Sequence, residues 1–429
     1  TTNSYTITLN ANGGSGGSSS TTVSYGATTL GTITNPSRAN TTGTRTISGF
    51  TMTTSGANAS VTYPSSGCTS ATNCKSTNTT TYTFNSWYKE SGTTNKIATN
   101  ATTPVLQAST SYTDANGKWT STSGQTLYAG WTASAGAYSS VTLPTITRTG
   151  STCGWATSST ATTWTYNSGA SVTPTGNMTL YGVCRNNITL NNAGATTAGS
   201  TSATVTYNAT SLSSITLPQR KYTVSGFTLT TSGANATVSS TSTLTNTATF
   251  NGWYTASSGG TKIAGNTTTP ALEASTTYTN SSKQWTYTTA GAITLYSQWT
   301  DNAVTLPTIT RTGSTCGWST SSTATTWTYN SGASFTPTAN TTLYGVCRNN
   351  ITLNLNGGNS GSTSATVNYG ATSLSTITAP GHANDTYTVS GFTKTTSATN
   401  ATISSTTTLN STRSYTFNGW YKESAGTNK

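Results

Sequence analysis

The sequence predicts an all-β chain that is organised as a tandem array of small modules. Long stretches alternate Thr or Ser with an apolar residue, as from Tyr5 to Leu9, which is the pattern of a strand with one solvent-facing side. The frequent Thr, Tyr and Trp residues favour strands. No segment places apolar residues at helical spacing for more than one turn, and whole segments recur along the chain.

The composition separates this chain from ordinary enzymes and from disordered chains. Only 6% of its 429 residues are charged, whereas a typical globular protein has about 25%. The net charge of +12 is dilute, and 11 Trp, 22 Tyr and 7 Phe are available for a core, so we expect the chain to fold. No apolar run approaches the roughly 20 residues that span a bilayer. The N-terminus, from Thr1 to Ser4, lacks the regions of a signal peptide, so we expect that any signal was removed or lies outside this fragment.

Internal repeats divide the chain into alternating long and short units. The ten residues 141–150 return unchanged from Val304, 163 residues after Val141. The motif Phe-Asn-(Ser/Gly)-Trp-Tyr marks each long unit and begins at Phe84, Phe250 and Phe417. Because the last unit stops before a closing Leu-Tyr motif, we expect the chain to be part of a longer array. The predicted units are long 1–132, short 133–186, long 187–301, short 302–349 and partial long 350–429.

Three short motifs recur in the same order in the long units. Asn-Gly-Gly opens the unit at residues 12–14 and 356–358, Phe-Asn-Gly-Trp-Tyr follows at 250–254 and 417–421, and Thr-Leu-Tyr-x-x-Trp closes it at 126–131 and 294–299. The short units carry the related residues Pro144, Arg148, Gly150, Gly154 and Trp155. These motifs resemble the Listeria–Bacteroides repeat, also called the internalin B-repeat. The resemblance implies a small β-grasp-like module of secreted or surface-attached bacterial proteins, which acts as a stalk or binding repeat without catalysis.

Two features depart from the family pattern. The long units contain Thr/Ser-rich insertions such as residues 49–83, which predict an elaborated β-grasp-like module. In the short unit, Cys184 stands where the long unit has its closing Trp131, and Cys153 stands near the other aromatic position. We interpret this as a packing pair that became a covalent pair.

The six Cys are predicted to form three disulfides within the units. Each short unit holds two Cys that are 31 residues apart, so pairing within a unit is the simplest connectivity. The other two Cys lie in an insertion of the first long unit, where we expect a local staple. Disulfides imply an oxidising, extracellular location. A zinc site would need more Cys or His nearby, so we expect no metal. The predicted pairs are Cys68 with Cys74, Cys153 with Cys184, and Cys316 with Cys347.

Aromatic residues are expected to supply much of the core, because aliphatic residues are few. We expect Trp253 and Trp299 to face each other inside one long unit. The predicted core aromatics are Phe84, Trp87, Trp131, Phe250, Trp253, Trp299, Phe417 and Trp420. Thr-rich neighbours leave room for a ligand-stacking platform at Trp119, Trp285, Trp164 and Trp327, and we take Trp164 and Trp327 as the candidate stacking residues.

The sequence predicts no catalytic site and no cofactor. The six carboxylates do not recur in register between copies except for Glu90 and Glu423, so no acid–base pair can be assembled repeatedly. We expect the single His382 to lie in a surface loop. The 18 Lys and Arg could attract acidic glycans, teichoic acids or nucleic acid, but they are scattered. We therefore expect them to serve structure and solubility, with no nucleic-acid partner.

The leading prediction is a secreted bacterial structural repeat protein that forms an elongated cell-surface stalk, fibre or adhesin shaft. Its partners would be the neighbouring repeats of the same chain and, in a fibre, identical chains. The first alternative is a surface module that binds a glycan or a host receptor. The second is an enzyme or a cell-wall-processing factor, which hydrolase activity from the fragment would support.

Overall fold

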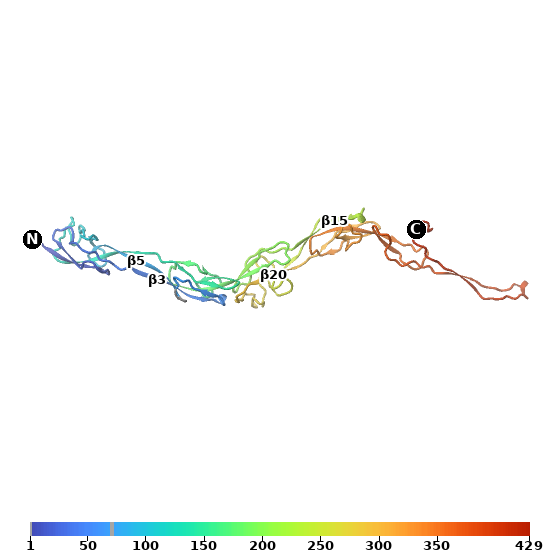
Figure 1. Cartoon of the computed structure of the whole chain (residues 1–429), viewed down its shortest axis with the longest axis horizontal. Helices are drawn as coiled ribbons and strands as arrows, with labels where there is room; N and C mark the ends of the chain where they lie inside the picture. Colours follow the sequence, from blue (N-terminus) through green and yellow to red (C-terminus); the bar gives the residue numbers. More distant parts are fainter. Residues whose placement is uncertain (1, 69–72) are drawn as a thin grey trace.

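The computed structural model describes residues 2–68 and 73–429 and confirms the all-β fold class. Those residues form strands and three single 3₁₀ turns, η1 (Thr54–Gly56), η2 (Thr231–Gly233) and η3 (Thr396–Ala398), but no α-helix. Within the described ranges, no helix could cross a membrane. Figure 1 shows the chain as a row of packed bodies that follow one another along its long axis, with the N-terminus at one end.

Body 1 comprises residues 2–40 and 84–132 and contains the opening, middle and closing strands of the first long unit. Closing strand β7 lies between the other two: it runs parallel to β1, with Leu9 beside Leu127, and antiparallel to β5, with Phe84 beside Trp131. Apolar side chains from all three strands share one core. The strands of body 1 are β1 (Ser4–Asn10), β2 (Ser20–Ser24), β5 (Asn73–Tyr88, shared with body 2), β6 (Lys96–Thr99) and β7 (Gln125–Ala135).

Body 2 joins the short unit to the insertion of the preceding long unit and comprises residues 41–68, 73–83 and 133–186. The insertion forms a hairpin of β3 with the first half of β5, and β3 runs parallel to β13, with Ile47 beside Met178. Ile47 and Phe50 of this hairpin pack in one core with Trp155 of the short unit. The other strands are β3 (Thr41–Met52), β4 (Ser60–Thr62), β8 (Val141–Thr142), β9 (Thr145–Thr147), β10 (Ser151–Ala156), β11 (Tyr166–Asn167), β12 (Ser171–Val172) and β13 (Met178–Asn191).

The packed bodies therefore differ from the repeat units of the sequence. The core of body 2 extends across the predicted boundary between residues 132 and 133. The physical reason is size: so short a segment has too few apolar side chains to bury a core of its own. The insertion supplies the missing apolar face.

Bodies 3 and 4 repeat this arrangement. Body 3 comprises residues 187–220 and 249–301, and body 4 comprises residues 221–248 and 302–349. As in body 2, the hairpin strand β15 runs parallel to the short-unit strand β26, with Val224 beside Thr341. The strands are β14 (Ser202–Thr206), β15 (Lys221–Leu229), β16 (Thr237–Val238), β17 (Leu244–Thr247), β18 (Thr249–Tyr254), β19 (Lys262–Ala264), β20 (Ile293–Thr300), β21 (Val304–Thr305), β22 (Ile309–Thr310), β23 (Ser314–Ser319), β24 (Tyr329–Asn330), β25 (Ser334–Phe335) and β26 (Thr341–Thr352).

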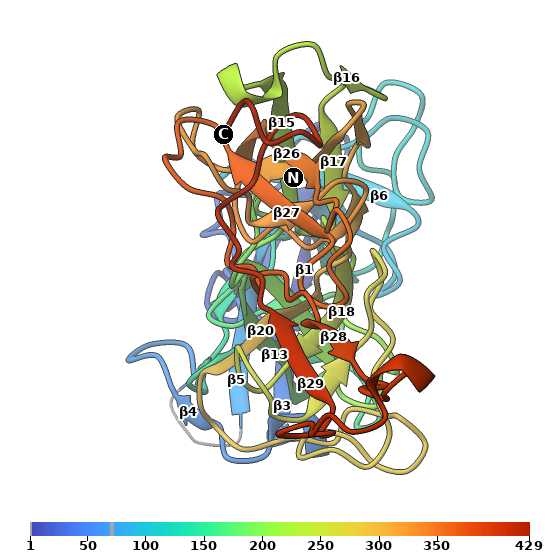
Figure 2. The same cartoon turned by 90° about the vertical axis from the view of Figure 1, so that its right-hand side faces the viewer.

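Body 5, residues 350–384 and 414–429, is the partial long unit. It contains the end of β26 and β27 (Ser364–Asn368), and a hairpin of β28 (Asp385–Val389) and β29 (Leu409–Arg413) extends from it. Figure 2, which views the molecule from this end, shows the hairpin in front. Val389 is 56% exposed, whereas its repeat counterpart Val224 is fully buried. The difference follows from pairing, because β15 lies against a short unit and β28 pairs with β29 alone.

Candidate functional site

Three of the four junctions between bodies are built from a strand that belongs to two bodies at once: β5 for bodies 1 and 2, β13 for bodies 2 and 3, and β26 for bodies 4 and 5. The first half of β13 pairs with β3 and β10 in body 2, and its second half pairs with β14 and β20 in body 3. Likewise, β5 pairs with β3 as far as Thr80 and with β7 from the same residue onward. At these junctions, the two bodies are joined by a hydrogen-bonded strand and not by a flexible linker. The shared strand couples the orientation of one body to that of the next. In Figure 1, β3 and β5 run lengthwise between the first two bodies.

The joint between bodies 3 and 4 is made differently. Here the sheet is interrupted at Ala248, between β17 and β18. Across this joint, Asn302 Nδ2 of body 4 donates to Thr249 Oγ1 of body 3 at 3.3 Å, and Ala248 N donates to Arg220 O at 2.9 Å. On the body 3 side, Arg220 and Asp301 form an ion pair, with Nε 3.4 Å from Oδ1. This joint therefore depends on side chains more than the strand-sharing joints do.

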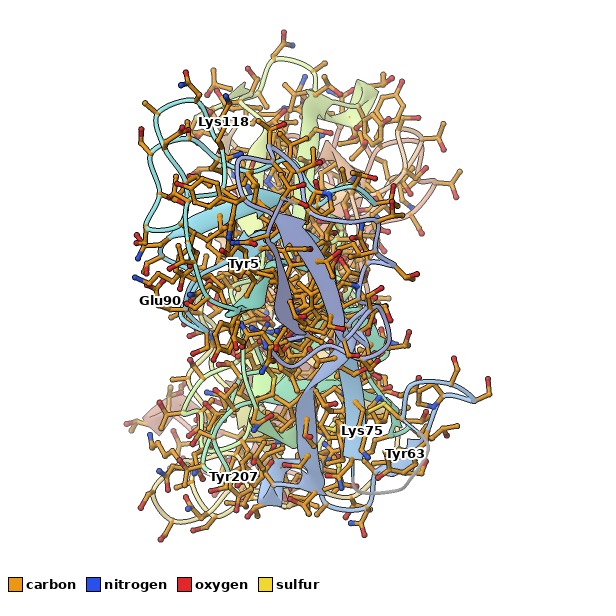
Figure 3. All side chains as sticks on the ribbon, turned by 90° about the vertical axis from the view of Figure 1, so that its left-hand side faces the viewer. Tyr5, Tyr63, Lys75, Glu90, Lys118 and Tyr207 are labelled. Atoms are coloured by element: carbon orange, nitrogen blue, oxygen red, sulfur yellow. A yellow bond between two sulfur atoms is a disulfide. The ribbon has the colours of Figure 1, made fainter. Side chains whose placement is uncertain are left out.

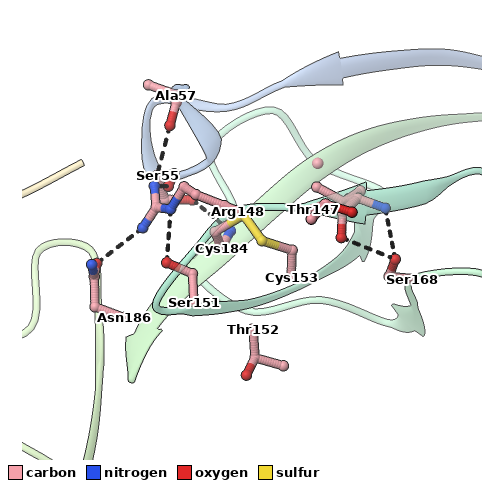
Figure 4. The surroundings of a disulfide bond; sticks show 12 residues. Ser55, Ala57, Thr147, Arg148, Ser151, Thr152, Cys153, Ser168, Cys184 and Asn186 are labelled. Carbon is pink, nitrogen blue, oxygen red and sulfur yellow. Dashed lines mark hydrogen bonds between the residues drawn. A yellow bond between two sulfur atoms is a disulfide. The ribbon is translucent and has the colours of Figure 1, made fainter. Parts of the chain in front are cut away.

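Arg148 closes the joint between bodies 2 and 3 and is only 5% exposed (Figure 4). Its guanidinium donates to oxygens from four separate segments, including Thr288 in body 3. The acceptors are Ser55 O at 2.6 Å, Ala57 O at 3.3 Å, Thr288 O at 3.1 Å, Ser151 Oγ at 2.8 Å and Asn186 Oδ1 at 3.0 Å. Burial lowers the pKa of Arg148 from its ordinary value. In the described parts of the chain, no carboxylate pairs with this buried cation, so hydrogen bonds alone compensate its charge.

Asn186 extends this network further into body 3. Its Oδ1 also accepts from Trp285 Nε1 at 3.2 Å, and Gly291 N donates to Thr149 O at 3.0 Å beside it. The sequence interpretation included Arg148 as a recurring motif residue but missed Asn186. The available signal was that Asn349 occupies the same repeat position.

In the second short unit, the residues equivalent to Arg148 and Asn186 are accessible to solvent. Arg311 bonds to Ser232 O and is partly exposed, and Asn349 is exposed whereas Asn186 is 2% exposed. The contrast lies in the contacts: Arg148 bonds to Thr288 O of the following body, whereas Arg311 bonds to Ser232 O of its own body. Arg311 therefore serves as an internal control for Arg148.

The structure contains three disulfides, which join the pairs expected from the sequence. Cys153 and Cys184 lie directly opposite each other on antiparallel β10 and β13, with Cα atoms 4.1 Å apart, and Cys316 and Cys347 do the same in body 4. This cross-strand position is the one that Phe84 and Trp131 occupy in body 1. An aromatic pair in the long unit is thus a covalent pair in the short unit. Cys68 bonds to Cys74 within the insertion.

Removing a short-unit disulfide should destabilise its body substantially. Replacing Cys153 and Cys184 by Ala is expected to lower the free energy of unfolding of body 2 by about 3 to 4 kcal/mol, because the bond constrains a loop with a separation of 31 residues. Urea unfolding followed by Trp fluorescence would measure this loss. The double replacement at Cys68 and Cys74, with a separation of 6 residues, should lose only about 2 kcal/mol from loop closure. An equal or larger loss from this second variant would contradict the expectation.

The predicted core aromatics occupy three kinds of environment. Trp87 and Trp253 are 1% and 0% exposed, whereas Phe417 is 41% exposed. Phe84 is buried, and Phe250, Trp131, Trp299 and Trp420 are partly buried. Trp253 and Trp299 do not face each other as expected, because Phe250 lies between them, 5.4 Å from Trp253 and 5.2 Å from Trp299 between ring centroids. The cross-strand register sets this order by placing Phe250, not Trp253, opposite Trp299.

The prediction that Trp119 and Trp285 form a ligand-stacking platform is wrong. Both are fully buried, and Trp285 stacks on Tyr278 with ring centroids 5.2 Å apart. Thr-rich neighbours suggested exposure, but Thr113 and Thr279, which lie opposite Trp119 and Trp285, are buried as well. Trp155 and Trp318, absent from the predicted core set, are also fully buried. Their signal was the recurrence of Cys-Gly-Trp at the same spacing.

The candidate stacking residues Trp164 and Trp327 are partly exposed in the short units. The indole of Trp164 lies against Gly154, where a Cβ would come within 2.2 Å of the ring. The Arg185 guanidinium is 4.9 Å from its ring centroid, and Arg348 is 4.7 Å from that of Trp327. Glycine and arginine residues of the same unit therefore already cover part of each indole ring. The ligand-stacking role stays a prediction.

Titratable groups are dispersed over the surface. Figure 3 shows Lys75, Glu90 and Lys118 apart from one another. His382 is exposed, and its ring lies at a tilt of 33° to that of Tyr415, with ring centroids 3.8 Å apart. Across residues 2–68 and 73–429, no group of three or more His, Cys, Asp or Glu is placed to hold a metal ion.

The comparison with known protein families identifies the same family that the sequence motifs resemble. Residues 5–42, 112–183 and 299–346 match the family model described as the Listeria-Bacteroides repeat domain, and together they make up less than half of the chain. No curated protein and no solved structure matches the chain significantly. The match at these three segments confirms the resemblance that the motifs predicted.

Proposed function

We propose that this chain is a stiff shaft segment of a bacterial surface protein, which holds another part of that protein at a distance from the cell. The observation that carries the proposal is the sharing of strands between successive bodies, above all β13. A shared strand cannot bend freely without breaking hydrogen bonds on both sides. Function then resides in the array, and the chain has no catalytic role.

Mechanical load along such a shaft would pass through paired strands. Where β13 leaves body 2, it is held by β3, by β10 and by the Cys153–Cys184 disulfide. Where it enters body 3, it is held by β14 and β20. Pulling along the strand loads these hydrogen bonds together in shear, and the buried Arg148 network resists opening of the joint. This arrangement suits a spacer under tension.

The location follows from composition and family. Disulfides persist in oxidising compartments, and the match to the Listeria-Bacteroides repeat domain supports a bacterial surface repeat protein. A surface of Thr, Ser and Asn with few charges gives little attraction for nucleic acid. We therefore place the shaft outside the cell.

Deletion of one repeat tests the spacer role. Removing residues 141–303 joins Ser140 to Val304, so that the hairpin of the first long unit meets the second short unit in an intact repeat pattern. Because stacked repeats contribute nearly independent stability, the remaining bodies should stay folded, and electron micrographs should show particles shortened by one repeat length. Particles of unchanged length, or loss of folding in body 1, would contradict the proposal.

A further inference from the structure

A pocket of about 370 Å³ opens in body 3. Its lining comes from the opening turn, from the loop that follows the Phe-Asn-Gly-Trp-Tyr motif, from the second half of β20 and from Arg220. Body 3 contains its closing strand β20, so the pocket is a feature of a complete long unit. Its volume lies within the range of small-molecule sites, about 300 to 1,000 Å³.

In body 1, the same place is closed by Asn12. Its Nδ2 donates to Ser91 O at 2.9 Å and to Ala129 O at 3.0 Å, so this side chain ties the opening turn to the loop and to the closing strand. The repeat counterpart of Asn12 in body 3 is Ala193, which has no side-chain group that could form these bonds. The turn and the loop of body 3 are therefore not tied together, and the pocket lies between them.

Gln298 holds the loop of body 3 from the closing strand. Its Nε2 donates to Ala256 O at 2.8 Å and also to Gly259 O. Body 1 has Gly130 at this position, which has no side chain for that role. Because the loop is fixed on the side of β20, the pocket between the loop and the opening turn is already formed without a ligand.

Several polar groups of the lining are available to a ligand. Ser257 and Ser258 are exposed, and neither hydroxyl forms a hydrogen bond with the described residues of the chain. Arg220 uses its Nε for Asp301 Oδ1, at 3.4 Å, and for Tyr222 Oη, at 3.3 Å. The two terminal nitrogens of Arg220 form no hydrogen bond within the described parts of the chain. The pocket therefore offers two hydroxyls and the free end of a guanidinium.

These polar groups lie beside an apolar edge and carry little net charge. A Cβ on Gly194 would lie 3.7 Å from Arg220 Nη1 and 3.8 Å from Trp299 Cδ1, so the guanidinium and the indole border the same space above the turn. Asp301 offsets the charge of Arg220, and no carboxylate is among the described residues that line the pocket. Closely spaced donors and acceptors beside an indole suit a pyranose ring, which has hydroxyls at its rim and an apolar C–H face.

We propose that this pocket binds one neutral sugar residue at the end of a glycan. The sugar hydroxyls exchange hydrogen bonds with Ser257 and Ser258 and accept from the terminal nitrogens of Arg220, while the C–H face packs on the accessible edge of Trp299. This site goes beyond the role of a shaft, because it lets the array hold a glycan at a defined body along its length. Body 1 has no such site, since Asn12 closes the equivalent place.

An array of immobilised oligosaccharides, probed with the labelled 429-residue chain, tests the proposal. Its neutral members end in glucose, galactose, mannose or N-acetylglucosamine, and its acidic members end in glucuronic or sialic acid. We expect saturable binding to at least one neutral terminus. The double variant Ser257→Ala/Ser258→Ala should weaken this binding by about tenfold or more, because two hydrogen bonds are lost. Both side chains are exposed, so this variant should fold as the parent chain does.

Two further variants use the comparison between bodies 1 and 3. Ser91→Ala changes the position in body 1 that corresponds to Ser257, and it should leave sugar binding unchanged. Ala193→Asn introduces the side chain that closes the place in body 1, and it should weaken binding.

Three results would overturn the sugar site. The first is no saturable binding to any neutral terminus, and the second is undiminished binding by the double Ser variant. The third is binding to acidic termini alone, which would indicate general attraction to a chain of net charge +12. None of these results affects the deletion test of the shaft, because that test measures particle length.

Discussion

Replacing Trp253 by Ala is expected to lower the free energy of unfolding of body 3 by about 3 to 5 kcal/mol. Trp253 is fully buried and packs edge-to-face against Phe250, with ring centroids 5.4 Å apart. A small body with few aliphatic residues cannot fill the resulting cavity. Hydrogen exchange measured by mass spectrometry would localise the loss to residues 187–220 and 249–301, while the neighbouring bodies keep their protection.

The matched control is Trp327→Ala in body 4. Trp327 is partly exposed and covers Gly317 on the outside of its sheet, so its removal creates no enclosed cavity. We expect a loss of less than about 1.5 kcal/mol. Equal losses from the two variants would show that the burial pattern described above does not reflect the energetics of the fold.

Replacing Arg148 by Ala should weaken the joint between bodies 2 and 3 by about 3 kcal/mol or more, because several buried oxygens lose their donor. Those oxygens include Ser55 O and Thr288 O, which the guanidinium now satisfies. Asn186 Oδ1 would keep only the bond that Trp285 Nε1 donates. Faster hydrogen exchange in the hairpin loop around Ser55 and in the segment around Thr288 would report the loosened joint.

Arg311→Ala is the control for this variant, because its guanidinium is partly exposed and bonds to Ser232 O. We expect less than half the loss seen at Arg148. If the two substitutions cost the same, the effect belongs to folding within the short unit and not to the joint between bodies.

Much of the local structure could be predicted from the sequence. Alternation of polar and apolar residues fixes which side of a strand is buried, as from Tyr5 to Leu9, where Ile7 and Leu9 are buried. The equal spacing of the two Cys in each short unit predicted disulfides within the units, and the structure contains them. These features are short-range or repeated, and a single sequence contains them in full.

The arrangement of the bodies could not be predicted in the same way. Residues 49–83 read as an elaboration of the long unit, yet their hairpin completes the core of the following short unit. Alternation says which face of β3 is apolar but not which strand it meets, and β13 lies more than a hundred residues away. The wrong prediction of a stacking platform at Trp119 has the same cause. Its Thr-rich sequence neighbours do not reveal which distant strands bury the indole.

Small-angle X-ray scattering of the intact chain tests the central claim, that shared strands hold the bodies in a stiff row. The account predicts a pair-distance distribution with an early maximum, set by the thickness of one body, and a long, nearly linear tail. A radius of gyration near the roughly 22 Å of a compact 429-residue domain, with a symmetric distribution, would contradict it.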